Sequence, residues 1–257
     1  MLQNNTFSEL IVGRKIIVLT KVDSTNNYLK NSLSKFEPLP HGTVILAEEQ
    51  YAGRGQMNSK WQADPGKNLT FSLLLHTSDL AIAHQFYLNK AISIAINETI
   101  ERIIGPVARI KWPNDVFAAD DKMGGVLIEN IIRGNTWKYA IIGIGINVNQ
   151  RHFPDDIKNV TSISRLLQAD YELPVLLSAL CRNMDTWYGI LKAGNLQTID
   201  DAYRDKLYRF NEAHLFEAAG ETFEGRIIDV DASGLLHVLT VNGIKVFNLK
   251  EIRFKDL

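Results

Sequence analysis

Residues 122–148 read Lys-Met-Gly-Gly-Val-Leu-Ile-Glu-Asn-Ile-Ile-Arg-Gly-Asn-Thr-Trp-Lys-Tyr-Ala-Ile-Ile-Gly-Ile-Gly-Ile-Asn-Val, and this stretch decides the fold. Its first apolar run begins on a double glycine, and its second run, 136–148, is nearly unbroken. Between them lies the turn signal Arg133-Gly-Asn135. Two apolar runs around a short Gly-Asn turn predict a β-hairpin of two long strands. We therefore place this hairpin in the core of a mixed sheet.

Outward from the hairpin, the apolar periodicity predicts further strands and helices of the same sheet. The expected strands are 15–20, 43–50, 69–75 and 107–110, and the expected helices are 23–33, 84–104, 163–167, 173–191 and 199–207. The helix at 84–104 is the longest of them. An α+β fold, with a mixed β-sheet and flanking helices, is the resulting prediction for residues 1–209.

Beyond Arg209 the pattern changes to five short alternating segments separated by turn residues. These segments are 215–218, 222–230, 235–240, 243–248 and 252–254. They predict a small C-terminal β-barrel over residues 210–257. Its expected interior side chains are Phe223, Ile227, Leu236, Val238, Val246 and Leu249.

Composition narrows the class of protein before any motif is considered. The 257 residues carry 28 Lys and Arg against 29 Asp and Glu, a formal net charge of −1, which argues against broad binding to nucleic acid or to an anionic membrane. The longest apolar run, 139–146, is far shorter than the ~18 residues of a membrane span. The single Cys181 cannot form an internal disulfide and favours the reducing cytoplasm, although a cysteine-poor secreted protein would look the same.

Several familiar catalytic patterns are missing from the sequence. The pairs Gly53-Arg-Gly55 and Gly143-Ile-Gly145 lack the third glycine of a dinucleotide-binding turn. No two of the six histidines have the spacing of zinc ligands. Neither a Gly-x-Ser-x-Gly elbow nor a Walker sequence occurs.

The loop Glu49-Gln-Tyr-Ala-Gly-Arg-Gly-Gln-Met-Asn-Ser-Lys-Trp61 is the first candidate site. Its glycines allow backbone N–H groups to approach a ligand, and Arg54 and Lys60 bring positive charge suited to phosphate. Trp61 offers a flat face on which a purine could stack. A flexible, solvated loop with Trp61 buried in the core fits the composition equally well.

Two further stretches place cations at the ends of predicted strands. In Lys111-Trp-Pro-Asn-Asp115, Pro113 must end a strand, so Lys111, Asn114 and Asp115 converge at its tip, where Lys suits phosphate and Asp suits Mg²⁺. A simple turn explains the same residues. Lys122 precedes Gly124-Gly125, which leaves room for an anionic ligand against the backbone, but a lysine there can also extend into water.

Taken together, five motifs resemble the biotin protein ligases in order and spacing. They are Asp23-Ser-Thr-Asn26, Glu49-Gln-x-x-Gly-Arg-Gly55 with Trp61, Lys111-Trp-Pro-Asn-Asp115, Lys122-x-Gly-Gly-Val-Leu-x-Glu129 and Gly143-Ile-Gly-Ile-Asn-Val148. The resemblance covers about residues 15–150 by motif and continues to the C-terminus by layout. It implies a catalytic domain like that of class II synthetases, shared with lipoate ligases, followed by an SH3-like barrel.

The resemblance also implies a reaction and its participants. Such ligases join biotin to ATP, with Mg²⁺, to form biotinyl-5′-adenylate, and then transfer the biotinyl group to a lysine of the biotin carboxyl carrier domain of a carboxylase. Lys122, Arg54 and Lys111 would be catalytic, and Asp115 would bind the metal. The implied biotin-binding residues are Ser24, Thr25, Asn26, Gln50, Gly53, Arg54, Gly55, Lys122, Gly124 and Gly125, and the implied nucleotide-binding residues are Gln56, Trp61, Asn114 and Asn147.

Two departures from the family pattern modify this expectation. Gln56, Met57, Asn58 and Ser59 follow Gly55 where many members have more arginine, which predicts weaker retention of the adenylate. The catalytic motifs begin close to Met1, so we expect a ligase without a DNA-reading module and without sequence-specific DNA binding. No membrane partner is expected, and a homodimer is left open. A lipoate–protein ligase and a non-catalytic biotin-binding protein are the alternatives, although the lysines at 111 and 122 argue against the second.

Overall fold

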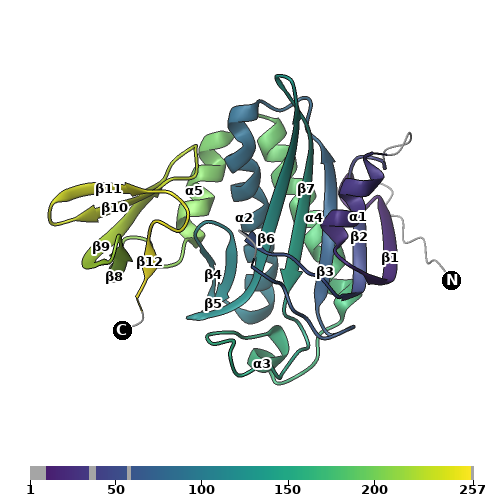
Figure 1. The fold of residues 1–257 in the computed structure, drawn as a ribbon, viewed down its shortest axis with the longest axis horizontal. Helices are drawn as coiled ribbons and strands as arrows, with labels where there is room; N and C mark the ends of the chain where they lie inside the picture. The colour runs from purple at the N-terminus through teal and green to yellow at the C-terminus, as the bar shows by residue number, and fades with distance from the viewer. Residues whose placement is uncertain (1–9, 35–38, 57–58, 256–257) are drawn as a thin grey trace.

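The computed structural model describes residues 10–34, 39–56 and 59–255, so Met57 and Asn58 of the glycine-containing loop lie outside the described residues. Two β-sheets make up its framework, and they lie side by side with helices between and behind them (Figure 1). No helix within the described ranges is both long and apolar enough to span a bilayer.

The larger sheet has seven strands in the order β1-β2-β3-β7-β6-β5-β4. These strands are β1 (Lys15–Val22), β2 (Thr43–Gln50), β3 (Leu69–His76), β4 (Ala108–Lys111), β5 (Asp115–Ala118), β6 (Asp121–Arg133) and β7 (Thr136–Ile146). β1 and β2 pair in parallel and all the other neighbours pair antiparallel. The predicted mixed sheet is confirmed, and so is its central hairpin, which turns where Arg133 pairs with Thr136.

Helices cover both faces of this sheet because successive side chains of a strand point to opposite sides. The helices are α1 (Thr25–Ser32), η2 (Ile82–His84), α2 (Gln85–Ile104), α3 (Ile163–Leu167), α4 (Leu173–Lys192) and α5 (Leu196–Lys206). Val44 and Leu73 belong to the large apolar core that α2 and α4 share. Their neighbours Ile45 and Leu74 face the other way and enclose Leu29 of α1.

The stretch around Pro113 differs from the sequence prediction. The strand β4 ends at Lys111 as expected, but the chain turns at once and returns as β5, with Lys111 paired to Asp115. A cis peptide bond joins Trp112 to Pro113 in this turn. The polar residues thus flank a tight hairpin instead of ending a strand in an open loop.

The smaller sheet is antiparallel, with the order β11-β10-β9-β8-β12, and is compatible with an SH3-like domain. Its strands are β8 (Ala213–Ala218), β9 (Glu221–Val230), β10 (Leu236–Thr240), β11 (Gly243–Phe247) and β12 (Arg253–Phe254). Ile227, Leu236 and Val238 are buried as predicted. The prediction for Val246 is wrong: its side chain is 47% exposed because β11 is an edge strand that turns this face to solvent.

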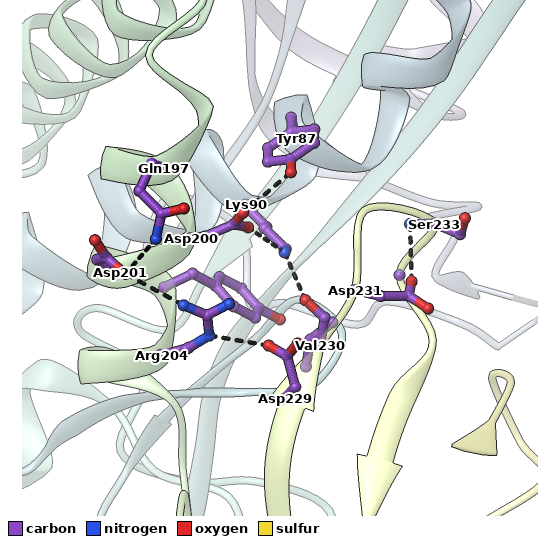
Figure 2. A network of polar contacts seen from close by, with 12 residues as sticks. Tyr87, Lys90, Gln197, Asp200, Asp201, Arg204, Asp229, Val230, Asp231 and Ser233 are labelled. Atoms are coloured by element: carbon purple, nitrogen blue, oxygen red, sulfur yellow. Dashed lines mark hydrogen bonds and ion pairs between the residues drawn. The ribbon is translucent and has the colours of Figure 1, made fainter.

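Buried polar contacts connect the smaller sheet to helices of the larger unit (Figure 2). Lys90 of α2 is 1% exposed, and its ammonium group lies 2.6 Å from Asp200 Oδ1 of α5 and 2.7 Å from the carbonyl oxygen of Val230, at the end of β9. The indole N–H of Trp112 donates to the carbonyl of Gly234 at 2.9 Å. The turn after β9 is therefore fixed against α2 and against the β4–β5 hairpin.

Candidate active site

A cavity opens where α1, the loop after β2 and strands β3, β6 and β7 meet, and we call it the main pocket. The structure brings eleven of the predicted site residues to its wall, namely Ser24, Thr25, Asn26, Gln50, Arg54, Gly55, Gln56, Trp61, Asp115, Lys122 and Gly125. Lys60, singled out in the sequence for its charge, also lines the wall. Sequence reasoning did not single out several others that complete it, namely Ser59, Thr70, Phe71, Val126, Leu127 and Ile144.

Three side chains of the pocket wall, Thr25, Asn26 and Gln50, form a continuous hydrogen-bonded row with the buried Ser72 behind them. Gln50 Oε1 accepts from both the backbone N–H and the hydroxyl of Thr25, at 2.7 and 3.0 Å. The Ser72 hydroxyl lies 2.6 Å from Thr25 Oγ1 and 2.6 Å from Asn26 Oδ1. Because each polar atom is fixed by its neighbour, the row presents a pre-organised set of donors and acceptors.

Backbone hydrogen bonds at Gly53 and Gly55 join the two sides of the loop after β2. Trp61 N–H donates to the Gly53 carbonyl at 3.0 Å, and Gly55 N–H donates to the Ser59 carbonyl at 2.7 Å. A Cβ atom at Gly53 would lie 2.4 Å from the Trp61 carbonyl oxygen, which no side chain could tolerate. Close backbone approach is the reason for glycine at this position.

Gly143 and Gly145 of β7 have a role that their sequence pattern did not reveal. A Cβ at Gly143 would lie 2.5 Å from Asn26 Oδ1, and one at Gly145 would lie 2.4 Å from the ring of Trp61. The two glycines therefore make the space in which Asn26 and Trp61 rest on the sheet. The Trp61 indole N–H also reaches Thr70 Oγ1 at 3.3 Å, so the ring is seated on the sheet and still lines the pocket.

Two ion pairs lie at the main pocket. Lys122 Nζ is 2.7 Å from Asp115 Oδ1, and Arg54 Nη2 is 2.6 Å from Glu129 Oε2. All four side chains are partly exposed, so an entering anion can reach both cations. Close by, Asp23 accepts a hydrogen bond from Asn27, and this bond, aided by the charge of Arg54, holds the pKa of Asp23 below its usual value.

Other predicted residues lie outside the main pocket. The Lys111 ammonium lies near the rings of Phe117, Tyr208 and Phe254, at 4.5, 5.8 and 4.8 Å, and Lys111 is not among the residues that line the main pocket. Gly53 lines a second hollow, to which Arg54 and Trp61 also contribute. A Cβ at Gly124 would meet the carbonyl of Gly145 at 2.5 Å, so Gly124 serves strand packing.

Two predicted nucleotide-binding asparagines are buried beside the pocket. Asn114 Nδ2 donates to the Val126 carbonyl at 2.5 Å, and Asn114 lines a third hollow together with Gln56. Asn147 Nδ2 donates to the Thr161 carbonyl at 3.1 Å. The buried Oδ1 of Asn147 has no hydrogen-bond partner among the described residues, so an acceptor is available there.

Metal-binding capacity is limited in the part of the chain that the structure describes. No group of three or more His, Cys, Asp or Glu side chains is arranged to hold a metal ion there. Asp115 is a carboxylate at the main pocket, and it already faces Lys122. A protein-only metal cage is therefore absent from the described residues.

Comparison with known proteins assigns this arrangement to a family. A model of the biotin/lipoate A/B protein ligase family matches residues 18–147, half of the chain. The chain belongs to this family. The matched span runs from β1 to the end of β7 and contains every residue that lines the main pocket.

Biotin ligases are among the similar members of the biotin/lipoate A/B protein ligase family. The bifunctional ligase/repressor BirA of Bacillus subtilis is 28% identical over 241 residues, covering 91% of this chain and 72% of its own. The biotin–[acetyl-CoA-carboxylase] ligase of Mycobacterium tuberculosis is 26% identical and covers 87% and 82%. The solved biotin protein ligase from Aquifex aeolicus in complex with biotin and ATP superposes with a TM-score of 0.79 at 26% identity, covering 94% and 99%.

Proposed function

We propose that this chain is a biotin–protein ligase, which activates biotin with ATP to biotinyl-5′-AMP and transfers the biotinyl group to a lysine of a carrier domain of a carboxylase. The observation that carries the proposal is the main pocket, where a row of fixed polar groups and two cations line the same cavity. The relatives named as biotin ligases favour this function over lipoate ligation.

The polar row suits the ureido group of biotin. That group has one carbonyl acceptor and two N–H donors, and Thr25 and Gln50 of the row, together with Ser24 of the same pocket wall, offer hydrogen-bond partners of both kinds. Gln50 Oε1 is already engaged by Thr25, which leaves the Gln50 amide N–H groups for the ligand. Phe71 and Ile144 add apolar surface to the same wall for the rest of the ring system.

In the first step, the biotin carboxylate attacks the α-phosphorus of ATP, a bond to the bridging oxygen breaks, and pyrophosphate leaves. Two anions must approach each other, so charge dominates the barrier. Lys122 and Arg54 line the pocket and would neutralise the carboxylate and the α-phosphate. No covalent attachment to the protein is required.

In the second step, the amine of the carrier lysine attacks the carbonyl carbon of the mixed anhydride. An amide bond forms, the bond to the phosphate oxygen breaks, and AMP leaves with its negative charge. Lys122 is the pocket cation that would stabilise the developing charge on the carbonyl oxygen. The amine proton leaves to water.

A magnesium ion brought with ATP fits the residues present. Mg²⁺ commonly binds through one or two carboxylates, with phosphates and waters completing its coordination, so the single carboxylate of Asp115 is a sufficient donor set. Asp115 would hold the ion, and the ion would neutralise phosphate charge.

For the adenosine end, we propose Trp61, Gln56, Asn114 and Asn147. The free buried acceptor of Asn147 matches an amino group such as that of adenine. Lys111 would act on the site indirectly. Its ammonium group lies over the ring of Phe254 and so connects β4 to the C-terminal strand β12. We further propose a division into a ligase domain, 1–209, and a C-terminal domain, 210–257, and an enzyme that acts in the cytoplasm on a carrier domain and not on DNA.

The test is adenylate formation by the purified chain. With biotin, ATP and Mg²⁺ we expect release of pyrophosphate and a bound biotinyl adenylate detectable by mass spectrometry. Parallel reactions with lipoate, and without either acid, separate the alternatives. Pyrophosphate release with lipoate but not biotin would overturn the proposal in favour of a lipoate ligase, and release with neither would favour a binding protein.

A further inference from the structure

Glu129 of β6 is a meeting point of three segments that surround the main pocket. Its Oε2 accepts a hydrogen bond from Arg54 Nη2 of the loop at 2.6 Å and another from Asn26 Nδ2 of α1 at 2.9 Å. Lys30 of α1 lies 4.0 Å from its other oxygen. One carboxylate thus connects the loop cation, the helix that begins the polar row, and the sheet.

The contacts of Glu129 continue into the polar row. Asn26 is almost completely buried, with its Nδ2 toward Glu129 and its Oδ1 on the Ser72 hydroxyl. Ser72 in turn contacts Thr25, which donates to Gln50. A chain of hydrogen bonds therefore links the partner of Arg54 to the side chains assigned to the ureido group.

The pairing leaves Arg54 able to bind a ligand. A guanidinium has five N–H donors in a planar fork, and Glu129 engages Nη2 from the side of β6. The remaining donors belong to a side chain that lines the main pocket. Glu129 can thus orient the guanidinium without occupying all of its donors.

We propose that Glu129 is a positioning residue that aims Arg54 at the carboxylate and α-phosphate end of the adenylate. The proposal rests on the proposed function. Glu129 touches no reacting atom; its effect passes through Arg54. It follows that removal of the Glu129 charge speeds loss of the adenylate only while Arg54 is present.

The experiment is a double-mutant cycle with Glu129→Gln and Arg54→Ala, together with Glu101→Gln as a matched control. Glu101 has a similarly exposed side chain, 26% against 24%, and pairs with Lys206 far from the pocket. Glu129→Gln keeps the shape and can still accept from Asn26. We expect it to raise the rate of adenylate dissociation about two- to fivefold, the scale of an exposed ion pair.

In the Arg54→Ala background we expect Glu129→Gln to change the dissociation rate by no further factor, whereas Glu101→Gln stays at the wild-type rate. Equal effects of Glu129→Gln with and without Arg54 would overturn the proposal, because Glu129 would then act through Asn26 or the fold. An unchanged rate in Glu129→Gln would overturn it as well.

The rate of trypsin cleavage after Arg54 is a readout that does not depend on ligase activity. Orientation of Arg54 by Glu129 predicts that Glu129→Gln speeds cleavage after Arg54 in the unliganded chain about two- to fivefold, while Glu101→Gln does not. If the wild-type chain makes no adenylate, the proposed function fails and this digestion still decides the role of Glu129. Unchanged cleavage would contradict it.

Discussion

Lys122 is the residue on which the proposed chemistry depends most. It lies 2.7 Å from Asp115, and its side chain is about two-fifths exposed, so the pair adds little to stability. Lys122→Ala should therefore fold normally by circular dichroism and lose about 10²-fold or more in the rate of pyrophosphate release, because a pre-placed charge is removed. Near-normal release by a folded variant would contradict the assignment.

At the same scale, the sequence could indicate which residues meet a ligand only where a motif stays local. Ser24, Thr25 and Gln50 were predicted together and line one pocket. Lys111 was predicted to be catalytic together with Lys122 and Arg54, and its ammonium lies over Phe254, a residue from the far end of the chain. No local pattern contains that contact, because it depends on how the second sheet docks.

At the scale of elements, the glycines of β7 determine whether the loop can rest on the sheet. Gly145→Ala would place a methyl group 2.4 Å from the ring of Trp61, so we expect a loss of about 1–3 kcal/mol in unfolding free energy and weaker adenylate binding. Gly189→Ala is the matched control: its Cβ meets nothing within 4 Å, and it lies inside α4, where alanine should stabilise by about 0.5–1 kcal/mol. Thermal denaturation measures both. Equal stability of the Gly145 variant and the wild type would contradict the seating of Trp61.

Lys90 joins elements that are distant in sequence. Lys90→Ala would leave the Asp200 carboxylate and the Val230 carbonyl without their buried partner, so we expect a loss of about 3–5 kcal/mol in urea denaturation. The control Lys192→Ala removes an exposed pair with Asp79 and should cost less than about 1 kcal/mol. Similar losses in the two variants would show that the Lys90 network does not secure the junction.

The elements themselves were largely predictable because hydrophobic periodicity is local. The strand predicted at 43–50 matches β2, and the helix predicted at 84–104 differs from α2 by one residue at its start. The strand β5 was missed, since Asp115–Ala118 is short and follows Pro113 with no glycine turn signal before it. The buried lysine of α2 was also missed, because its partners come from α5 and β9.

At the scale of the whole molecule, the reactivity of the buried Cys181 thiol indicates whether the core is folded. Burial raises the pKa of its thiol from 9.0 to about 12. The unfolded chain would lose this proton first as pH rises, so the thiol's contribution to stability is complete below pH 9 and declines between pH 9 and 12. We expect Ellman's reagent at pH 8 to label the native protein only after urea unfolds it, with Cys181→Ser as the blank. Rapid labelling of the native chain would contradict this burial.

The presence of a second, C-terminal β-structure was predictable, because five short alternating segments follow the helices in the sequence. Their docking was not, since it rests on contacts such as Trp112 to Gly234 that no spacing encodes. This whole assembly would transfer the biotinyl group to a carrier.

Biotin transfer is tested most directly by the intact mass of a biotin carboxyl carrier domain after incubation with this chain, biotin, ATP and Mg²⁺. We expect one biotinyl mass increment on the carrier, lost when ATP is omitted and absent when the acceptor lysine is replaced by arginine. A carrier of unchanged mass, with the chain folded and biotin and ATP in excess, would contradict it.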